Sequence, residues 1–233
     1  MKKYLIEGIE KINLPYTEEK IDNLLKYLEL LVEYNSHTNL TAIRDKEGII
    51  EKHFIDSLLV QEFITEDMKK AIDIGTGAGF PGMVLAIYNP NIEFVLMDSV
   101  GKKTKFLEMV AETLGLNNVT VINDRAEEYI TEENRETFDL GLCRGVSKLN
   151  TILEYMIPFI KVNGIFLPQK MEGTGEEEEA QSALNILNST IEKIYRRNLP
   201  YCGDERVILE ILKKDHTDKK YPRRTGIPLK KPL

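Results

Sequence analysis

The segment D-I-G-T-G-A-G-F-P-G, residues Asp73 to Gly82, follows a short apolar run and precedes a helical pattern. Gly75, Gly77 and Gly79 alternate with other residues, so the backbone can turn sharply and approach a ligand closely. A glycine-rich turn between a strand and a helix is typical of a nucleotide site at the carboxyl end of a parallel sheet. The segment therefore predicts an α/β fold with a ligand site at this turn.

The same glycines also fit the G-x-G-x-x-G pattern of dinucleotide-binding domains, through Gly77, Gly79 and Gly82. Asp73 opposes that interpretation, because its carboxylate would repel a pyrophosphate and attract the ammonium of a methionyl group. A phosphate loop of the nucleoside triphosphatase kind is excluded, because no Gly-Lys-Ser/Thr follows. S-adenosylmethionine is therefore the favoured ligand, and an NAD(P)-dependent oxidoreductase stays open as the alternative.

Apolar runs that predict strands alternate with helical patterns along the rest of the chain. The predicted strands are 71–74, 92–99, 118–124, 137–143, 163–170, 190–196 and 205–213. This alternation predicts a parallel sheet with helices on both faces. Only a short loop, 198–204, separates the last two strands, so we expect these two to pair antiparallel.

The ends of the second and third predicted strands carry further candidate cofactor residues. Asp98 lies 23 residues after Gly75, where its carboxylate can accept both hydroxyls of a ribose. Ser99 lies beside it and belongs to the same predicted site. Ala126 and Glu127 follow the third strand, where backbone groups could contact an adenine edge.

The first 65 residues are predicted to be helical. Apolar residues from Ile21 to Val32 recur with a period of 3.6, with Thr17 as a candidate N-cap, and a second helix begins near Asp45. Its apolar face is expected to contain Ile50, Phe54 and Leu58. Short helices of this kind cannot bury both faces, so we expect residues 1–65 to be a cap that docks on the sheet.

Charge is unevenly spread along the 233 residues. The whole chain has a net charge of −7, but residues 213–233 hold eight Lys/Arg and two Asp, a net +6, which leaves −13 for the rest. The basic tail predicts local RNA binding, with packing on the sheet as the alternative. Cys143 and Cys202 lack CxxC spacing, and no apolar run approaches membrane-span length. These features favour a cytoplasmic protein without a structural metal.

Several separated motifs in one order resemble the bacterial small-subunit (16S) ribosomal RNA guanine-N7 methyltransferase family, also called glucose-inhibited division protein B. The motifs are YNSHTNLTAIRD (34–45), KHFIDSL (52–58), AIDIGTGAGFPG (71–82), LMDSVGKKTKFL (96–107), NDRAEE (123–128), CRGVSKL (143–149), LPQK (167–170) and KYPRRTGIPLKKPL (220–233). Two positions depart from the family: Cys143-Arg144-Gly145 replaces its usual Ser-Arg-Ala, and Leu167-Pro168-Gln169-Lys170 replaces its frequent Leu-Lys-Gly.

The resemblance implies a class I S-adenosylmethionine-dependent methyltransferase, Rossmann-like, with a mostly parallel seven-stranded sheet and an antiparallel last strand. The expected division is an N-terminal helical cap (1–65), the methyltransferase domain (66–214) and a basic C-terminal tail (215–233). Carried over from the family, the cofactor positions are Gly75, Phe80, Ala126, Glu127 and Arg144. Small-subunit ribosomal RNA or the ribosomal subunit is the implied partner. No membrane and no metal are expected; the sequence leaves the oligomeric state open, with a monomer as the expectation. A non-catalytic ribosome-binding module with this fold is a second alternative.

Guanine N7 has a free lone pair, so such an enzyme needs mainly to align an in-line displacement and exclude water. Arg144 is the candidate catalytic residue, because its guanidinium could hold the guanine or a flanking phosphate. His53 and Asp56 are three residues apart on one helix and could hydrogen-bond to each other. We interpret them first as a structural pair between cap and sheet, with a direct role at guanine as the alternative. The role of Lys170 stays open.

Overall fold

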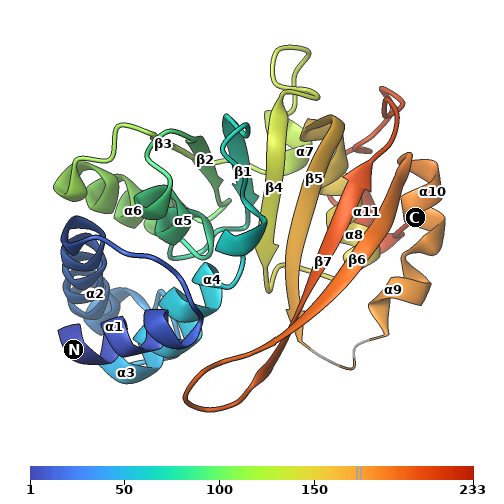
Figure 1. The fold of residues 1–233 in the computed structure, drawn as a ribbon. Helices are drawn as coiled ribbons and strands as arrows, with labels where there is room; N and C mark the ends of the chain where they lie inside the picture. The colour runs from blue at the N-terminus through green and yellow to red at the C-terminus, as the bar shows by residue number, and fades with distance from the viewer. Residues whose placement is uncertain (172, 174) are drawn as a thin grey trace.

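The computed structural model describes residues 1–171, 173 and 175–233, and it begins with a group of helices. Helices α1 (Lys2–Lys11), α2 (Glu18–Thr38) and α3 (Lys46–Ile49) lie together at the N-terminal end of the molecule (Figure 1). The Thr17 side chain accepts a hydrogen bond from the Lys20 N–H and so begins α2 as predicted.

The helix that starts at α3 does not continue as an ordinary α-helix. Asp45 begins it as predicted, but the chain widens into a π-helical turn over Ile50–Ile55 before it ends as α4 (Asp56–Leu58). The sequence pattern did not predict this turn. The three apolar positions expected for the helix are all buried: Ile50, Phe54 and Leu58. Single π-helical turns inside α-helices are frequent at functional sites.

Seven strands form one sheet in the order β3-β2-β1-β4-β5-β7-β6. Their bounds are β1 Lys70–Ile74, β2 Glu93–Met97, β3 Val119–Ile122, β4 Phe138–Arg144, β5 Ile160–Met171, β6 Ser189–Asn198 and β7 Glu205–Lys213. The first five strands are parallel, and β7 runs antiparallel to both β5 and β6. The predicted mostly parallel sheet with an antiparallel late strand is therefore confirmed. Because the strand order reverses between β1 and β4, the carboxyl ends of these strands form a switch point.

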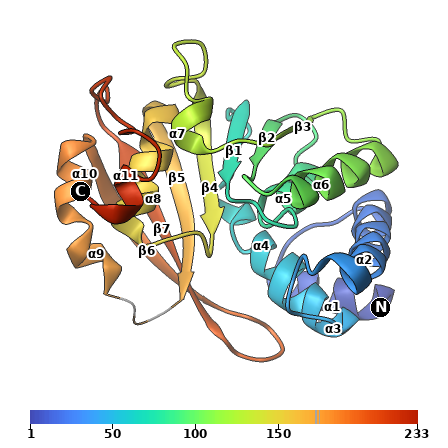
Figure 2. The same ribbon diagram turned by 180° about the vertical axis from the view of Figure 1, so that it is seen from behind.

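Helices cover both faces of the sheet, as predicted, and Figures 1 and 2 show α8, α10 and α11 at the opposite end of the molecule from the N-terminal helices. The helices between strands are α5 Gly82–Tyr88, α6 Gly101–Leu114, α7 Ala126–Tyr129, α8 Leu149–Met156, α9 Glu176–Glu179 and α10 Gln181–Ile186. Alternate residues of β1 separate the two faces. Ala71 packs with the cap and α5, whereas Ile72 and Ile74 pack with α8.

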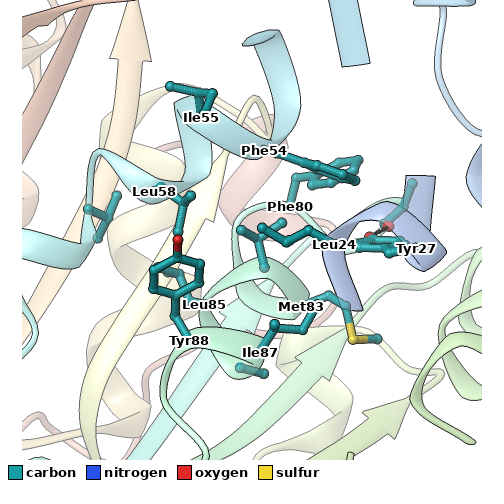
Figure 3. Packing of buried hydrophobic residues seen from close by; sticks show 14 of the residues in the cluster. Leu24, Tyr27, Phe54, Ile55, Leu58, Phe80, Met83, Leu85, Ile87 and Tyr88 are labelled. Atoms are coloured by element: carbon teal, nitrogen blue, oxygen red, sulfur yellow. Dashed lines mark hydrogen bonds between the residues drawn. The ribbon is translucent and has the colours of Figure 1, made fainter. Parts of the chain in front are cut away.

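The cap shares one hydrophobic core with a face of the sheet. Leu24 and Tyr27 from α2 meet Phe54 of the π-helical turn and Phe80 and Met83 at the start of α5 (Figure 3). All five side chains are almost completely buried. Burying a large apolar side chain contributes ~1.5–3 kcal/mol, so the cap is held to the sheet by packing.

The hairpin that joins β6 to β7 reaches back to the cap (Figure 1). The buried Glu51 carboxylate accepts hydrogen bonds from the Tyr201 N–H at 2.9 Å and the Cys202 N–H at 2.6 Å. The Tyr201 ring stacks on Tyr4 of α1 with ring centroids 4.1 Å apart. These contacts fasten the loop between β6 and β7 to α1 and to the π-helical turn.

The C-terminal segment packs against the body instead of projecting from it. Lys213 is fully buried with its Nζ 2.6 Å from Glu136, and Arg223 lies 2.6 Å from the buried Glu154 of α8. The segment ends in the short helix α11 (Ile227–Lys230). Five of its eight basic residues have carboxylate partners: Lys213, Lys214, Lys219, Lys220 and Arg223. The segment therefore packs on the body, as the alternative expected, and RNA binding through its basic residues stays a prediction.

Candidate functional site

The glycine loop connects β1 to α5 at the switch point of the sheet. Gly75, Gly77 and Gly79 have φ values of 71°, 63° and 104°, a region that favours glycine, as the sequence predicts. The Gly75 N–H donates to the Met97 carbonyl at 2.8 Å, and the Gly77 N–H donates to Asp98 Oδ2 at 3.0 Å. A Cβ added to Gly77 would meet nothing within 4 Å, so open space adjoins the loop there.

Gly79 and Phe80 belong to the packing between the loop and the cap. A Cβ on Gly79 would come within 2.8 Å of the Met83 Cβ. The buried Phe80 ring stacks on His53 with ring centroids 4.5 Å apart. It also stacks on Tyr27, with ring centroids 5.7 Å apart. Their assignment to the cofactor site stays a prediction, and the structure gives both a packing role.

A first cavity of about 310 Å³ opens beside the glycine loop. Five of the predicted cofactor residues line it: Gly75, Asp98, Ser99, Ala126 and Glu127. Sequence reasoning missed other lining residues: Lys103, Asp124, Arg125, Val146 and Tyr155. The NDRAEE motif contained Asp124 and Arg125, and Lys103 lies five residues after Asp98 on the next helix, so spacing alone could have found these three.

Asp98 is held firmly in the wall of the first cavity. It is 6% exposed; its Oδ1 accepts from the Val100 N–H at 2.9 Å, and its Oδ2 lies 3.3 Å from the Lys103 Nζ. Glu127 is held by the C-terminal segment, because its Oε1 accepts from the Gly226 N–H at 3.1 Å. The two acidic side chains therefore present oriented oxygens at the cavity.

Asp73 lies behind the loop and is fully buried. Its Oδ2 accepts from the Gly82 N–H at 2.8 Å, and its Oδ1 has no hydrogen-bond partner within the described ranges. Burial raises the pKa of Asp73 to about 7. The carboxylate thus occupies the start of α5, and its role toward a methionyl ammonium stays a prediction.

A second cavity of about 860 Å³ adjoins the first, and Gly145 and Val146 line both. Arg144 lines the second cavity and not the first, so the structure separates it from the five predicted cofactor residues that line the first. Further residues of this wall come from the cap and from the last strands: Lys52, His53, Asp56, Gln169, Lys170 and Arg206. The predicted site lacked Arg206, which no local pattern marks, and Gln169, although the LPQK motif contains it.

Arg144 is bound on its inner side by the cap. Its Nη1 donates to the Lys52 carbonyl and to Asp56 Oδ2, both at 3.1 Å, and its Nη2 lies 3.0 Å from His53 Nδ1. The guanidinium carbon lies 5.4 Å from the centre of the Phe80 ring. The predicted pair of His53 and Asp56 therefore joins cap to sheet through Arg144. Among the described residues, the two side chains bond to Arg144 and to other partners, and the only hydrogen bond between them is from the Asp56 backbone N–H to the His53 carbonyl.

His53 is neutral in this arrangement. Burial lowers its pKa to about 3, and the charge of Arg144 adds to the effect. Because a guanidinium only donates, His53 Nδ1 is the acceptor, and the proton on Nε2 points to Thr41 Oγ1 at 2.7 Å. His53 thus orients Arg144 and carries no charge of its own.

Lys170 and Cys143 have structural surroundings. The Lys170 Nζ donates to the Ser147 carbonyl at 2.6 Å and to Glu176 at 2.8 Å, which ties β5 to the loop after β4. Burial raises the pKa of the Cys143 thiol, so this side chain is not an activated nucleophile. In the described part of the chain, no cluster of three or more His, Cys, Asp or Glu side chains could hold a metal ion.

Comparison with known proteins matches this chain to one family over most of its length. The family model described as GidB, rRNA small subunit methyltransferase G, matches residues 20–206. The ribosomal RNA small subunit methyltransferase G of Fusobacterium nucleatum subsp. nucleatum is 61% identical over 233 residues, which cover 100% of both chains. The protein of the same name from Acetivibrio thermocellus is 42% identical and covers 100% of this chain and 97% of its own.

Two of the solved structures that resemble this one have low sequence identity to it. M. jannaschii TYW2 in complex with AdoMet has a TM-score of 0.57 at 17% identity, covering 75% of this chain and 80% of that chain. A SAM dependent methyltransferase from Aquifex aeolicus also has a TM-score of 0.57, at 16% identity, covering 75% and 97%. The likeness shows the fold, and it confirms the predicted class I methyltransferase architecture.

Proposed function

Since the chain belongs to the GidB family, rRNA small subunit methyltransferase G, we propose that it transfers a methyl group from S-adenosylmethionine to N7 of one guanine in small-subunit (16S) ribosomal RNA. The family that the sequence motifs indicate is thereby confirmed. The observation that carries the proposal is the shared wall of Gly145 and Val146, because a cofactor in the first cavity and a base in the second would meet there.

The first cavity fits S-adenosylmethionine by its charge and its free space. Its lining holds three carboxylates (Asp98, Asp124 and Glu127) and two cations (Lys103 and Arg125), so it carries one net negative charge. S-adenosylmethionine has a sulfonium and an ammonium against one carboxylate, and is thus a net cation. Asp98 would accept the ribose hydroxyls, and the open side of Gly77 leaves room for close approach.

Asp73 argues against the dinucleotide alternative. A pyrophosphate binds at the N-terminus of the helix that follows the first strand. Here the Gly82 N–H is already bonded to Asp73, and Pro81 before it has no N–H to offer. The free and buried Oδ1 of Asp73 instead suits an ammonium donor. An NAD(P) site is therefore disfavoured by the local hydrogen bonds as well as by charge.

The chemistry asks little of the protein beyond alignment. When bound, S-adenosylmethionine supplies a methyl group on a sulfonium, and the lone pair of guanine N7 accepts it without prior loss of a proton. The neutral His53 is therefore not required as a base, and it serves to orient Arg144. We assign Arg144 to the RNA, because it lines the second cavity, where it would bind a base or phosphate.

The same proposal includes the setting of the reaction. We propose cytoplasmic small-subunit ribosomal RNA or a ribosomal particle as the partner and a monomer as the active form. The division into a cap (1–65), a methyltransferase domain (66–214) and a C-terminal segment (215–233) is proposed with it. No helix within the described residues combines the length and the hydropathy that a membrane span requires.

The test combines binding with transfer. The protein is dialysed against labelled S-adenosylmethionine or NADH, and then incubated with unmethylated 16S ribosomal RNA or small subunits. We expect binding of S-adenosylmethionine alone and a labelled 7-methylguanine on nucleoside analysis. NADH binding would favour the oxidoreductase, and cofactor binding without transfer to either substrate would favour the non-catalytic module.

A further inference from the structure

Asp56 connects the cap to three neighbouring strands at the second cavity. The side chain is 3% exposed, and its Oδ2 accepts from Arg144 Nη1 at 3.1 Å and from Arg206 Nε at 3.0 Å. The Gln169 Nε2 donates to the Asp56 carbonyl at 2.7 Å. These three donors come from β4, β5 and β7, so one residue of the cap, through its carboxylate and its backbone carbonyl, holds side chains from three strands.

The π-helical turn prepares this arrangement. The Asp56 N–H bonds to the carbonyls of Glu51 and His53 and not to that of Lys52, which an α-helix would require. The Lys52 carbonyl instead accepts from Arg144 Nη1. Lys52, His53 and Asp56 thus all contact the same guanidinium from one side of the turn.

The two arginines keep donors for a ligand. Their side chains are 17% and 14% exposed, and both line the second cavity. Within the part of the chain that the structure describes, Arg206 uses its Nε and Nη1 internally, and Nη2 has no hydrogen bond. Two guanidinium groups against one carboxylate leave one net positive charge on Arg144, Arg206 and Asp56.

The chemistry of the reaction decides what these donors bind. Guanidinium groups bind guanine through O6 and N7, but a hydrogen bond to N7 would occupy the lone pair that must accept the methyl group. A backbone phosphate has no such conflict, and its oxygens suit paired guanidinium donors. The favoured ligand is therefore a phosphate of the RNA chain next to the target base.

We propose that Asp56 is a positioning residue, which holds Arg144 and Arg206 as a pair that binds an RNA phosphate in the second cavity. The inference rests on the proposed function for its substrate. For the change in RNA affinity on mutation of Asp56, the proposal predicts the opposite sign from that expected from net charge alone. Replacing Asp56 by asparagine removes a negative charge from the cavity, which by itself would tighten RNA binding, whereas loss of the positioned pair weakens it.

The experiment measures RNA affinity, its salt dependence and cofactor affinity for Asp56→Asn and Arg206→Gln in the full-length protein. We expect RNA binding about tenfold weaker for each, since one to two charge-assisted hydrogen bonds are lost. The slope of log affinity against log salt should fall by ~0.7–0.9, the value for one phosphate. The dissociation constant of S-adenosylmethionine should change less than about twofold, because neither residue lines the first cavity.

Asp139→Asn is the matched control. Asp139 lies at the opposite end of β4, and it too accepts from three donors: the Lys69 N–H, the Lys70 N–H and the Lys161 Nζ. The Asp139→Asn substitution should lower the melting temperature without changing RNA affinity or the salt slope. RNA binding that is unchanged or tighter in Asp56→Asn overturns the proposal, and so does an equal loss in Asp139→Asn.

Arg206→Gln keeps the proposal testable if Asp56→Asn does not fold, because normal RNA affinity and salt slope in that variant would also overturn it. Methyl transfer by the wild type is measured separately. Its absence would count against the proposed function, while the binding data still decide the role of Asp56.

Discussion

Replacing Arg223 by alanine tests whether one buried ion pair anchors the C-terminal segment. The Glu154 side chain is completely buried, and its oxygens accept from Arg223 Nε at 2.9 Å and Nη2 at 2.6 Å. The Arg223 backbone N–H also donates to this carboxylate, at 2.8 Å. Alanine keeps only this last bond, so a buried charge loses its charged partner.

Removing one member of a buried ion pair costs ~3–5 kcal/mol, because the remaining charge stays out of water. The Arg223 side chain is 27% exposed and its backbone N–H still reaches Glu154. We therefore expect a loss at the lower end of that range, about 3 kcal/mol in the free energy of unfolding.

Urea unfolding followed by circular dichroism measures this loss as a lower midpoint at unchanged slope. The control adds Glu154→Gln to Arg223→Ala; removing the unpaired charge should restore ~1–2 kcal/mol. A loss below ~1 kcal/mol for Arg223→Ala, the usual value of a surface pair, would refute the anchoring by Glu154.

Three further predictions follow from the site and the tail. Asp98→Ala should weaken S-adenosylmethionine roughly tenfold or more by calorimetric titration; an unchanged dissociation constant would contradict its role at the ribose. Asp73 has a pKa of about 7 in the folded protein against 3.8 unfolded, so the folded state keeps a proton that the unfolded state loses, and stability falls between pH 4 and 7. As pH rises from 4 to 7, the melting temperature of Asp73→Asn should therefore rise relative to that of the wild type. A difference between the two melting temperatures that stays constant with pH would argue against the raised pKa of Asp73. Deleting residues 219–233 should lower the melting temperature and leave the salt slope of RNA binding nearly unchanged. A slope shallower by two or more units would instead support RNA binding by the tail.

The sheet was predictable because its signals are local. Each strand is a short apolar run between turn residues, and the short loop 198–204 identified the antiparallel pair without knowledge of any contact. Thr17 was predictable in the same way, since an N-cap needs only its own side chain and the N–H groups of the next turn.

The parts of the site that escaped prediction depend on distant residues. Arg144 meets His53 and Asp56 across 91 and 88 positions of sequence, and no spacing rule covers such separations. Gly79 was interpreted as a ligand-binding glycine, which stays a prediction; that Tyr27 and Met83 lie against it was not predicted. The sequence indicated that the backbone at Gly79 needs glycine. It did not indicate that packed side chains, as well as a ligand, could require this.

The tail shows a limit of charge counting. A net +6 over residues 213–233 predicted local RNA binding, but carboxylates that pair with part of this charge, among them Glu132, Glu136 and Glu154, are spread through the acidic remainder. Opposite charges on one chain attract each other first. A count by segment therefore cannot tell a free arm from a docked one.

The two cavities differ in when a growing chain can complete them. Every residue that lines the first cavity lies between Ile74 and Tyr155, whereas the second needs residues from Ile43 to Arg206. During synthesis from the N-terminus, the first cavity has its full set of lining residues about fifty positions before the second. The proposed RNA site therefore cannot be complete until β7, the last strand to be synthesised, has been made.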